Sequence, residues 1–243
     1  MRLYPPPARE AGGVGIYGDL ALPPPASSSR PYVVINMVAS VDGRSSRSGK
    51  ASEIGGEADR RAMRELRSKV DAVMVGAGTL RAERVNLGLD NSVAEQPLAL
   101  ILCGCGHLPL AECLVESPQE TLLVMSDDSP GPRGAVPACA KVLRVPSPSP
   151  GRIDLKALLW VLRSEHAVKR LLVEGGPTVN RALVDERLVD ELFVTVAPKL
   201  LSGEESAILV GGSATEAPEN LTLLSVRASG DELFLRYRLD QSP

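Results

Sequence analysis

The sequence predicts one α/β domain built around a mostly parallel β-sheet with at least one antiparallel edge. Apolar segments rich in β-branched residues alternate with amphipathic helical segments through the middle of the chain. These apolar segments show little polar–apolar alternation, which is typical of strands that helices cover on both faces. Near the C-terminus, two further strand-like segments are separated only by Gly230 and Asp231, a spacing that predicts a hairpin.

The chain begins with a segment that cannot form a core. Residues 1–30 are rich in Pro, Gly and Ser, so we expect an arm that lies over the domain or is disordered. A single domain is expected over residues 31–243. It opens with a buried strand at 32–40, and a polar, glycine- and serine-rich loop follows at 41–56. Residues 57–70 form a predicted helix, because apolar side chains recur at helical spacing and acids precede bases, as the helix dipole favours.

The rest of the chain continues the alternation of strands and helices. A short buried strand, 71–80, ends in Gly-Ala-Gly-Thr, and a loop follows at 84–96. Further strands are expected at 97–103, 121–126, 140–145, 168–176 and 190–201, with helices at 153–167 and from 178 to about 184. The terminal hairpin, 221–229 and 232–240, gives the sheet its antiparallel edge.

Composition narrows the classes of function. Of 243 residues, 44% are hydrophobic and 23% are charged, as in ordinary globular proteins. Only 3% are aromatic and the net charge is −3, so the chain has neither base-stacking platforms nor an attraction to nucleic acids or anionic membranes. We find no run of about 18 apolar residues that could span a membrane and no secretion signal. We therefore expect a cytoplasmic protein without nucleic-acid or membrane partners.

The cysteines and histidines do not predict a metal site. None of the cysteines has Cys-x-x-Cys spacing, and only two histidines are present (Cys103, Cys105, Cys113, Cys139; His107, His166). A structural zinc site or a disulfide framework is therefore not expected. The segment "CGCGH" is interpreted as a strand end that runs into a turn.

Three strand ends attract attention, because ligands of open α/β sheets bind beyond the carboxyl ends of the strands. They are "NMVASVDGR", "VGAGTLRAE" and "VEGGPTVN". In the second, Gly76 and Gly78 would let a ligand approach the backbone, and Thr79 could cap a helix or donate to a phosphate. A plain tight turn is an equal alternative, since Arg81 fills the sixth position of G-x-G-x-x-G. Asp42 in the first is either a turn-forming residue or a ligand contact.

The third strand end is the most specific. Glycines 175–176 at a strand-to-helix junction would leave backbone N–H groups free to bind an anion. Pro177 suits the first turn of a helix, and Thr178 and Asn180 could add donors. Glu174 would repel a phosphate, so we expect it to face a second ligand, unless it is simply an exposed acid.

Three ordered motifs resemble the reductase domain of riboflavin biosynthesis: "NMVASVDGR", "LRSKVDAVMVGAGTLRAE" and "LLVEGGPTVNRALVDERLVDELFVTVAPKLLSG". The resemblance covers roughly residues 31–240. It implies a dihydrofolate-reductase-like fold with helices on both faces of the sheet, and a homodimer. It also implies reduction by NADPH of 5-amino-6-(5-phosphoribosylamino)uracil, or its 2,5-diaminopyrimidinone analogue, to the ribitylamino product. Since the H-x-E and P-C-x-x-C motifs of the accompanying zinc deaminase are absent, we expect a stand-alone reductase.

The resemblance, together with the glycine-rich turns, assigns two sets of residues. The set expected at NADPH comprises Val38, Gly76, Gly78, Thr79, Glu83, Gly175, Gly176, Pro177, Thr178, Val179 and Asn180. The set expected at the substrate comprises Asn36, Asp42, Ser52, Arg67, Leu87 and Glu174. Glu174 is also a candidate proton donor, with water as the alternative, because burial could raise its pKa.

One loop departs from the family pattern. Residues 83–90 read "ERVNLGLD", and Asp90 stands where an arginine of the substrate-phosphate site is expected. Compensating charge could come from Arg44, Arg47, Lys50 or Arg64. Two alternatives therefore stay open: a reductase of another heterocycle, such as dihydrofolate or a dihydropterin, and a catalytically silent nucleotide-binding module.

Overall fold

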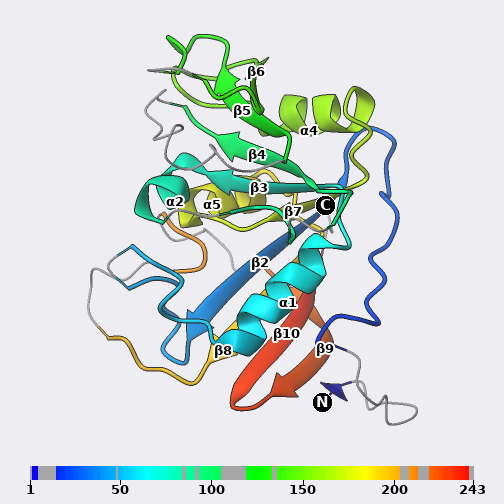
Figure 1. Ribbon diagram of the computed structural model, residues 1–243, viewed down its shortest axis with the longest axis vertical. Helices are drawn as coiled ribbons and strands as arrows, with labels where there is room; N and C mark the ends of the chain where they lie inside the picture. Colours follow the sequence, from blue (N-terminus) through cyan, green and yellow to red (C-terminus); the bar gives the residue numbers. More distant parts are fainter. Residues whose placement is uncertain are drawn as a thin grey trace.

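The computed structural model describes residues 2–4, 15–47, 49–83, 86–90, 93–104, 119–132, 136–202, 208–212 and 219–240. Within these ranges a ten-stranded sheet has the order β1-β9-β10-β8-β2-β7-β3-β4-β5-β6 (Figure 1). The strands are β1 (Arg2–Tyr4), β2 (Tyr32–Ser40), β3 (Ala72–Gly76), β4 (Leu98–Leu102), β5 (Thr121–Ser126), β6 (Ala140–Val145), β7 (Arg170–Val173), β8 (Glu191–Ala197), β9 (Leu221–Ser229) and β10 (Glu232–Leu239). The helices are α1 (Glu57–Arg67), α2 (Ala77–Ala82), α4 (Leu155–Ser164) and α5 (Pro177–Asp185).

The pairing of the strands confirms the predicted sheet. All strands from β8 through β2, β7, β3, β4 and β5 to β6 pair in parallel. On the other side of β8, strands β10, β9 and β1 continue the sheet in antiparallel pairs. β9 and β10 are the predicted terminal hairpin, and Gly230 in its turn has a φ of 57°, which a residue with a side chain rarely adopts.

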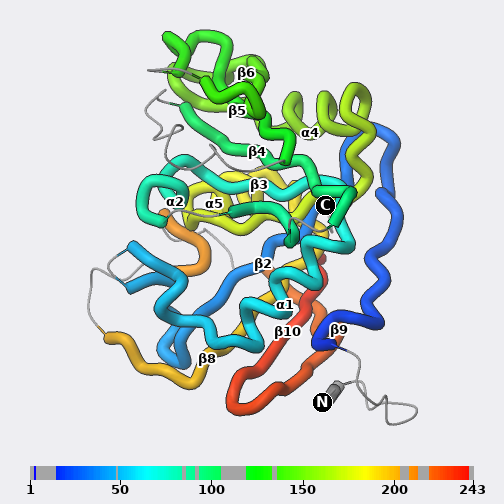
Figure 2. Tube along the Cα trace, in the orientation of Figure 1, coloured from blue at the N-terminus to red at the C-terminus, as the bar shows by residue number. Residues whose placement is uncertain are grey.

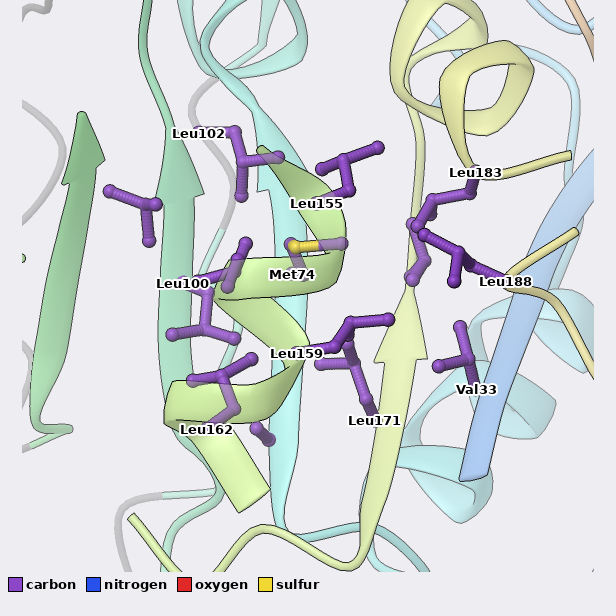
Figure 3. Close-up of a cluster of buried hydrophobic side chains, with 14 of the residues drawn as sticks. Val33, Met74, Leu100, Leu102, Leu155, Leu159, Leu162, Leu171, Leu183 and Leu188 are labelled. Carbon is purple, nitrogen blue, oxygen red and sulfur yellow. The ribbon is translucent and has the colours of Figure 1, made fainter. Parts of the chain in front are cut away.

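Helices cover both faces of the sheet, as expected. α1 packs through Ala62 and Leu66 against one face, while α4 and α5 pack against the other face in the cluster that Figure 3 shows. Adjacent residues of β2, Val33 and Val34, belong to the two different clusters, so this strand is buried from both sides. That double burial explains why the strand lacks alternation of polar and apolar residues.

Part of the proline-rich N-terminal segment belongs to the core. The ring of Tyr17 is 2% exposed and lies edge-on to Phe193, with 5.3 Å between ring centroids, and to Phe234, with 6.2 Å. Figure 2 shows this segment, in dark blue, running along one side of the molecule from the β9–β10 hairpin towards α4. The expected arm therefore contributes core residues as well as surface.

Some predicted bounds differ from the structure. The strand predicted at 71–80 ends at Gly76, because Ala77–Ala82 turns into α2. The helix predicted at 57–70 ends at Arg67, and Val70, whose spacing suggested a longer helix, packs against the core from the turn that follows. β4 ends at Leu102, as the interpretation of "CGCGH" required, whereas Cys105, His107 and Cys113 lie outside the described residues. None of the helices in the described ranges is long and apolar enough to cross a membrane.

Candidate active site

The three strand ends singled out in the sequence meet at one edge of the sheet. β7 lies between β2 and β3 and is parallel to both, so the residues that follow β3 and β7 emerge beside the second half of β2, which begins at Asn36. Tertiary hydrogen bonds join two of the junctions directly: the amide of Gly76 donates to the carbonyl of Gly175 over 2.8 Å, and the amide of Glu174 donates to the carbonyl of Met74 over 2.9 Å. The ends of β3 and β7 therefore meet, and Asn36 of the first motif lies beside them, whereas the loop after β2 lies further out.

The glycines at this edge allow two helices to start in contact. A Cβ on Gly76 would lie 2.8 Å from Cγ2 of Val179, and a Cβ on Gly176 would lie 3.0 Å from Oγ1 of Thr79. Gly175 has a φ of 88°, and the peptide between Gly175 and Gly176 is cis. A larger side chain at Gly76 or Gly176 would therefore push α2 and α5 apart.

The helix starts can attract an anion. Gly76 and Gly176 are the N-cap residues of α2 and α5, and neither helix has a side-chain cap. The first-turn N–H groups of uncapped helices carry partial positive charge and seek an acceptor. A Cβ on Gly78 would meet nothing within 4 Å, so the surface of α2 is open beside these groups. A phosphate-bearing ligand can therefore approach both helices at once.

The other residues predicted at the cofactor divide into two groups. Thr178 is exposed in the first turn of α5, where a ligand can reach it. Asn180, in contrast, is buried, and its Nδ2 donates over 2.8 Å to the carbonyl of Leu209. The carboxylate of Glu83, at the end of α2, accepts hydrogen bonds from the amides of Ala51 and Ser52. Asn180 and Glu83 thus fix neighbouring segments around the site.

The face of the edge that carries α1 holds the predicted substrate residues. Val34 of β2 and Leu172 of β7 belong to the core cluster under α1. Because side chains alternate along a strand, Asn36 and Glu174, two residues further on, point to the same face. Ile35 and Val173 are partners in the β2–β7 register, which makes Asn36 and Glu174 neighbours.

A buried ion pair dominates this face. Nε and Nη2 of Arg67 donate to Oε1 and Oε2 of Glu174 over 2.8 and 2.7 Å, and the two side chains are 5% and 10% exposed. Nη1 of Arg67 also donates to the carbonyls of Asn86, over 2.6 Å, and Gly88, over 3.0 Å. The loop that contains the buried Leu87 is therefore held against α1. Arg67, Leu87 and Glu174 are brought together as predicted.

The ion pair weakens the hypothesis that Glu174 is the proton donor. Both carboxylate oxygens accept hydrogen bonds from one guanidinium group, which is the arrangement of an ionised carboxylate. Glu174 orients Arg67 and lies beside Asn36, and its role as a proton donor stays a prediction.

Asp42 and Ser52 occupy the periphery of the edge. Asp42 is exposed, and its carboxylate accepts from the hydroxyl of Ser40 over 2.6 Å and from the amides of Leu201 and Ser202 over 3.1 and 2.9 Å. These bonds, that of Ser40 first, lower its pKa to about 2. Asp42 thus joins the turn after β2 to the segment after β8, which gives it a structural role.

Sequence reasoning missed Asp59. Its carboxyl bonds the hydroxyl of Thr195, and its pKa is raised to about 6, mainly because burial disfavours the charged form. The signal was present in the helical pattern: Asp59 lies three residues before Ala62 and seven before Leu66, both buried. An acid at such a position faces the sheet.

Residues 31–235 match the model of the RibD C-terminal domain. The chain belongs to this family. It is 30% identical to the 2,5-diamino-6-ribosylamino-4(3H)-pyrimidinone 5′-phosphate reductase of Methanothermobacter thermautotrophicus, over 86% of this chain and 98% of the relative. The protein of the same name from Aquifex aeolicus is 31% identical, over 82% of this chain and 91% of the relative. The fold of this RibD C-terminal domain superposes on Acinetobacter baumannii RibD with a TM-score of 0.71 and 27% identity, covering 88% of this chain and 59% of that protein.

Proposed function

We propose that this RibD C-terminal domain reduces 2,5-diamino-6-ribosylamino-4(3H)-pyrimidinone 5′-phosphate to its ribitylamino product in riboflavin biosynthesis, with NADPH as the reductant. One observation carries the proposal: two uncapped helix starts and the buried Arg67–Glu174 pair share a single sheet edge. Such an edge can receive a phosphate-bearing cofactor beside a polar, hydrogen-bonding substrate.

The diaminopyrimidinone is the favoured substrate, because the relatives that this chain matches over nearly their whole length are named for its reduction. Relatives named for its reduction are matched over 98% and 91% of their length, whereas the RibD of Escherichia coli, 27% identical, is matched over 50%. 5-Amino-6-(5-phosphoribosylamino)uracil, the deaminated analogue, is the second candidate.

The residues present fit a nicotinamide dinucleotide. Gly78 leaves open space beside α2, and the other glycines let α2 and α5 start in contact, so that both helix starts can provide N–H groups for the phosphates. When bound, the reduced nicotinamide supplies a hydride. The task of the protein is then to present C1′ of the sugar, as the carbon of an open-chain imine, at the correct distance and angle. Asn36 and Glu174 are placed to hold the substrate by its polar groups.

The phosphate of the substrate requires a cation. Arg44, Arg47, Lys50 and Arg64 are the candidates. Arg64 is exposed on α1 one turn before Arg67, while Arg47 lies 3.9 Å from Glu53. Asp90 is exposed on the facing loop and would repel a phosphate placed beside it.

The test is oxidation of NADPH, followed by its absorbance, with each substrate in turn. We expect turnover with the diaminopyrimidinone phosphate, slower turnover with the uracil analogue, and none with dihydrofolate. NADH serves as the control for the 2′-phosphate of the cofactor. Binding of NADPH without turnover on any substrate would instead favour the catalytically silent module.

We also propose that the protein is a homodimer that works in the cytoplasm. Apolar side chains are exposed along the antiparallel end of the sheet and after β8: Leu221 and Leu233 at 41% and 40%, and Leu200 at 75%. A symmetric dimer would cover such positions. Light scattering coupled to size-exclusion chromatography distinguishes a dimer from a monomer.

A further inference from the structure

The proposed reduction leaves one chemical requirement without an assigned residue. When a hydride adds to C1′ of an imine, the electrons of the C=N bond move to nitrogen, and that nitrogen must take up a proton. The described residues offer few acids for this step. Glu174 is committed to Arg67, and His166 lies after α4, at the opposite end of β7 from the site. Tyr17 and Tyr32 are buried, and their pKa values are raised further above neutrality by burial.

Asp59 lies on the correct face of the correct edge. The hydroxyl of Thr195 bonds its carboxyl, and Thr195 is the partner of Val38 in the β8–β2 register. Phe193, two residues before Thr195, belongs to the core cluster under α1, so Thr195 also points to the α1 face. Across the sheet on this face the order is therefore Thr195 on β8, then Asn36 and Val38 on β2, then Glu174 directly after β7. Asp59 is bonded to the β8 partner of Val38, which is two residues beyond Asn36 on this face, while Glu174 is the neighbour of Asn36 on the other side.

The surroundings of Asp59 favour the protonated carboxyl. Glu232 of β10 lies directly beside it, since its carboxylate accepts from the amides of Gly56, over 2.6 Å, and Asp59, over 3.1 Å. Glu174, directly after β7, adds a second negative charge. The guanidinium of Arg60 on α1 donates to the carbonyl of Gly55. Its positive charge lowers the pKa of Asp59, but by less than burial and the two acids together raise it. Burial, which is the largest cause, and the two acids raise that pKa to about 6.

We propose that Asp59 donates the proton that the reduction consumes, an inference that rests on the proposed function. The hydride adds to C1′, the C=N electron pair becomes the lone pair of the amine nitrogen, and the O–H bond of Asp59 breaks to form the N–H bond. The resulting carboxylate takes a proton back from solvent, which its partial exposure allows. Asn36 and Glu174 hold the substrate while Asp59 supplies the acid.

The main test is Asp59→Asn, which keeps the shape of the side chain and removes the proton. We expect kcat to fall at least about 100-fold, the usual scale for loss of a general acid. The affinity for NADPH, measured by isothermal titration calorimetry, should stay unchanged. Asp59→Glu should recover part of the activity. Retention of kcat within about threefold by Asp59→Asn would overturn the proposal.

Substitution of two residues beside Asp59 tests the proposal without changing Asp59 itself. The measurement is the dependence of kcat/KM on pH. In the wild type, kcat/KM should fall as the pH rises through the pKa of Asp59. Glu232→Gln removes a charge that raises this pKa, so the midpoint should move to lower pH. Thr195→Val removes a hydrogen bond that lowers it, so the midpoint should move to higher pH. Midpoints that do not move in these opposite directions would contradict the assignment. Absence of turnover in the wild type would overturn both this inference and the proposed function, whereas an inactive Asp59→Asn beside an active wild type leaves the function standing.

Discussion

Replacing Arg67 by methionine tests whether the buried ion pair holds the candidate site together. The change leaves the Glu174 carboxylate, 10% exposed, without its cation. At 2.7 Å and an effective dielectric constant of about 20, the attraction between the two charges amounts to about 6 kcal/mol before the cost of removing both from water. Breaking a buried pair at one partner typically costs about 3–5 kcal/mol. We expect Arg67→Met to lower the free energy of unfolding by that amount.

The matched variants are Glu174→Gln and the double variant. Glu174→Gln should cost only about 1–3 kcal/mol, because Arg67 keeps the carbonyls of Asn86 and Gly88 as acceptors. The double variant contains neither charge, so it should be more stable than the sum of the single effects predicts, by about 2 kcal/mol. Urea unfolding at neutral pH, with the midpoints compared at constant slope, measures all three. Strictly additive effects would show that solvent screens the pair and would refute the reasoning.

Three further predictions concern other parts of the molecule. Gly76→Ala should weaken NADPH binding and lower the free energy of unfolding by about 1–3 kcal/mol, because its Cβ would lie 2.8 Å from Val179. Gly78→Ala is the control, since the space around Gly78 is open and its stability should not fall. Equal melting temperatures of the two variants would contradict this prediction. Tyr17→Ala should cost about 3–5 kcal/mol in urea unfolding, because the ring is 2% exposed in the core; a loss below about 1 kcal/mol would show that the N-terminal segment is only loosely attached. Asp59→Asn should stabilise the protein at pH 8 by on the order of 2 kcal/mol. Because folding raises the pKa of Asp59 to about 6, the wild-type protein loses stability as the pH rises from about 4 to 6, whereas the asparagine variant does not. The gain should vanish below about pH 4, and melting curves at both pH values measure it.

The sheet was predictable because most of its strands are buried on both faces. Such strands read as continuous apolar runs, and the predicted bounds of β2 and β5 agree with the structure. The carboxyl-end rule then placed three loops at one edge without knowledge of the strand order. The start of α2 was missed because "GAGTL" contains two glycines, which suggested a turn where the chain forms a helix.

The pairings within the site could not be predicted from local patterns. Arg67 and Glu174 are separated by 107 positions, and helical spacing places Arg67 on α1 without indicating its partner. Thr195 reads as one β-branched residue among several in β8, so nothing in the sequence marks it as the partner of Asp59. The core position of Tyr17 was obscured by its neighbours, since Pro, Gly and Ser around it are typical of segments that do not pack.

The position of β7 has a practical consequence for dividing the protein. This strand comes late in the chain but pairs between β2 and β3, which come early. A break in the turn at 146–152 would therefore produce two fragments, one with Gly76 and Arg67 and the other with Glu174 and Gly176. Neither fragment would contain a complete site, and insertion of β7 into the gap would restore it. Binding of a nicotinamide dinucleotide could then report the association of any two proteins fused to the halves.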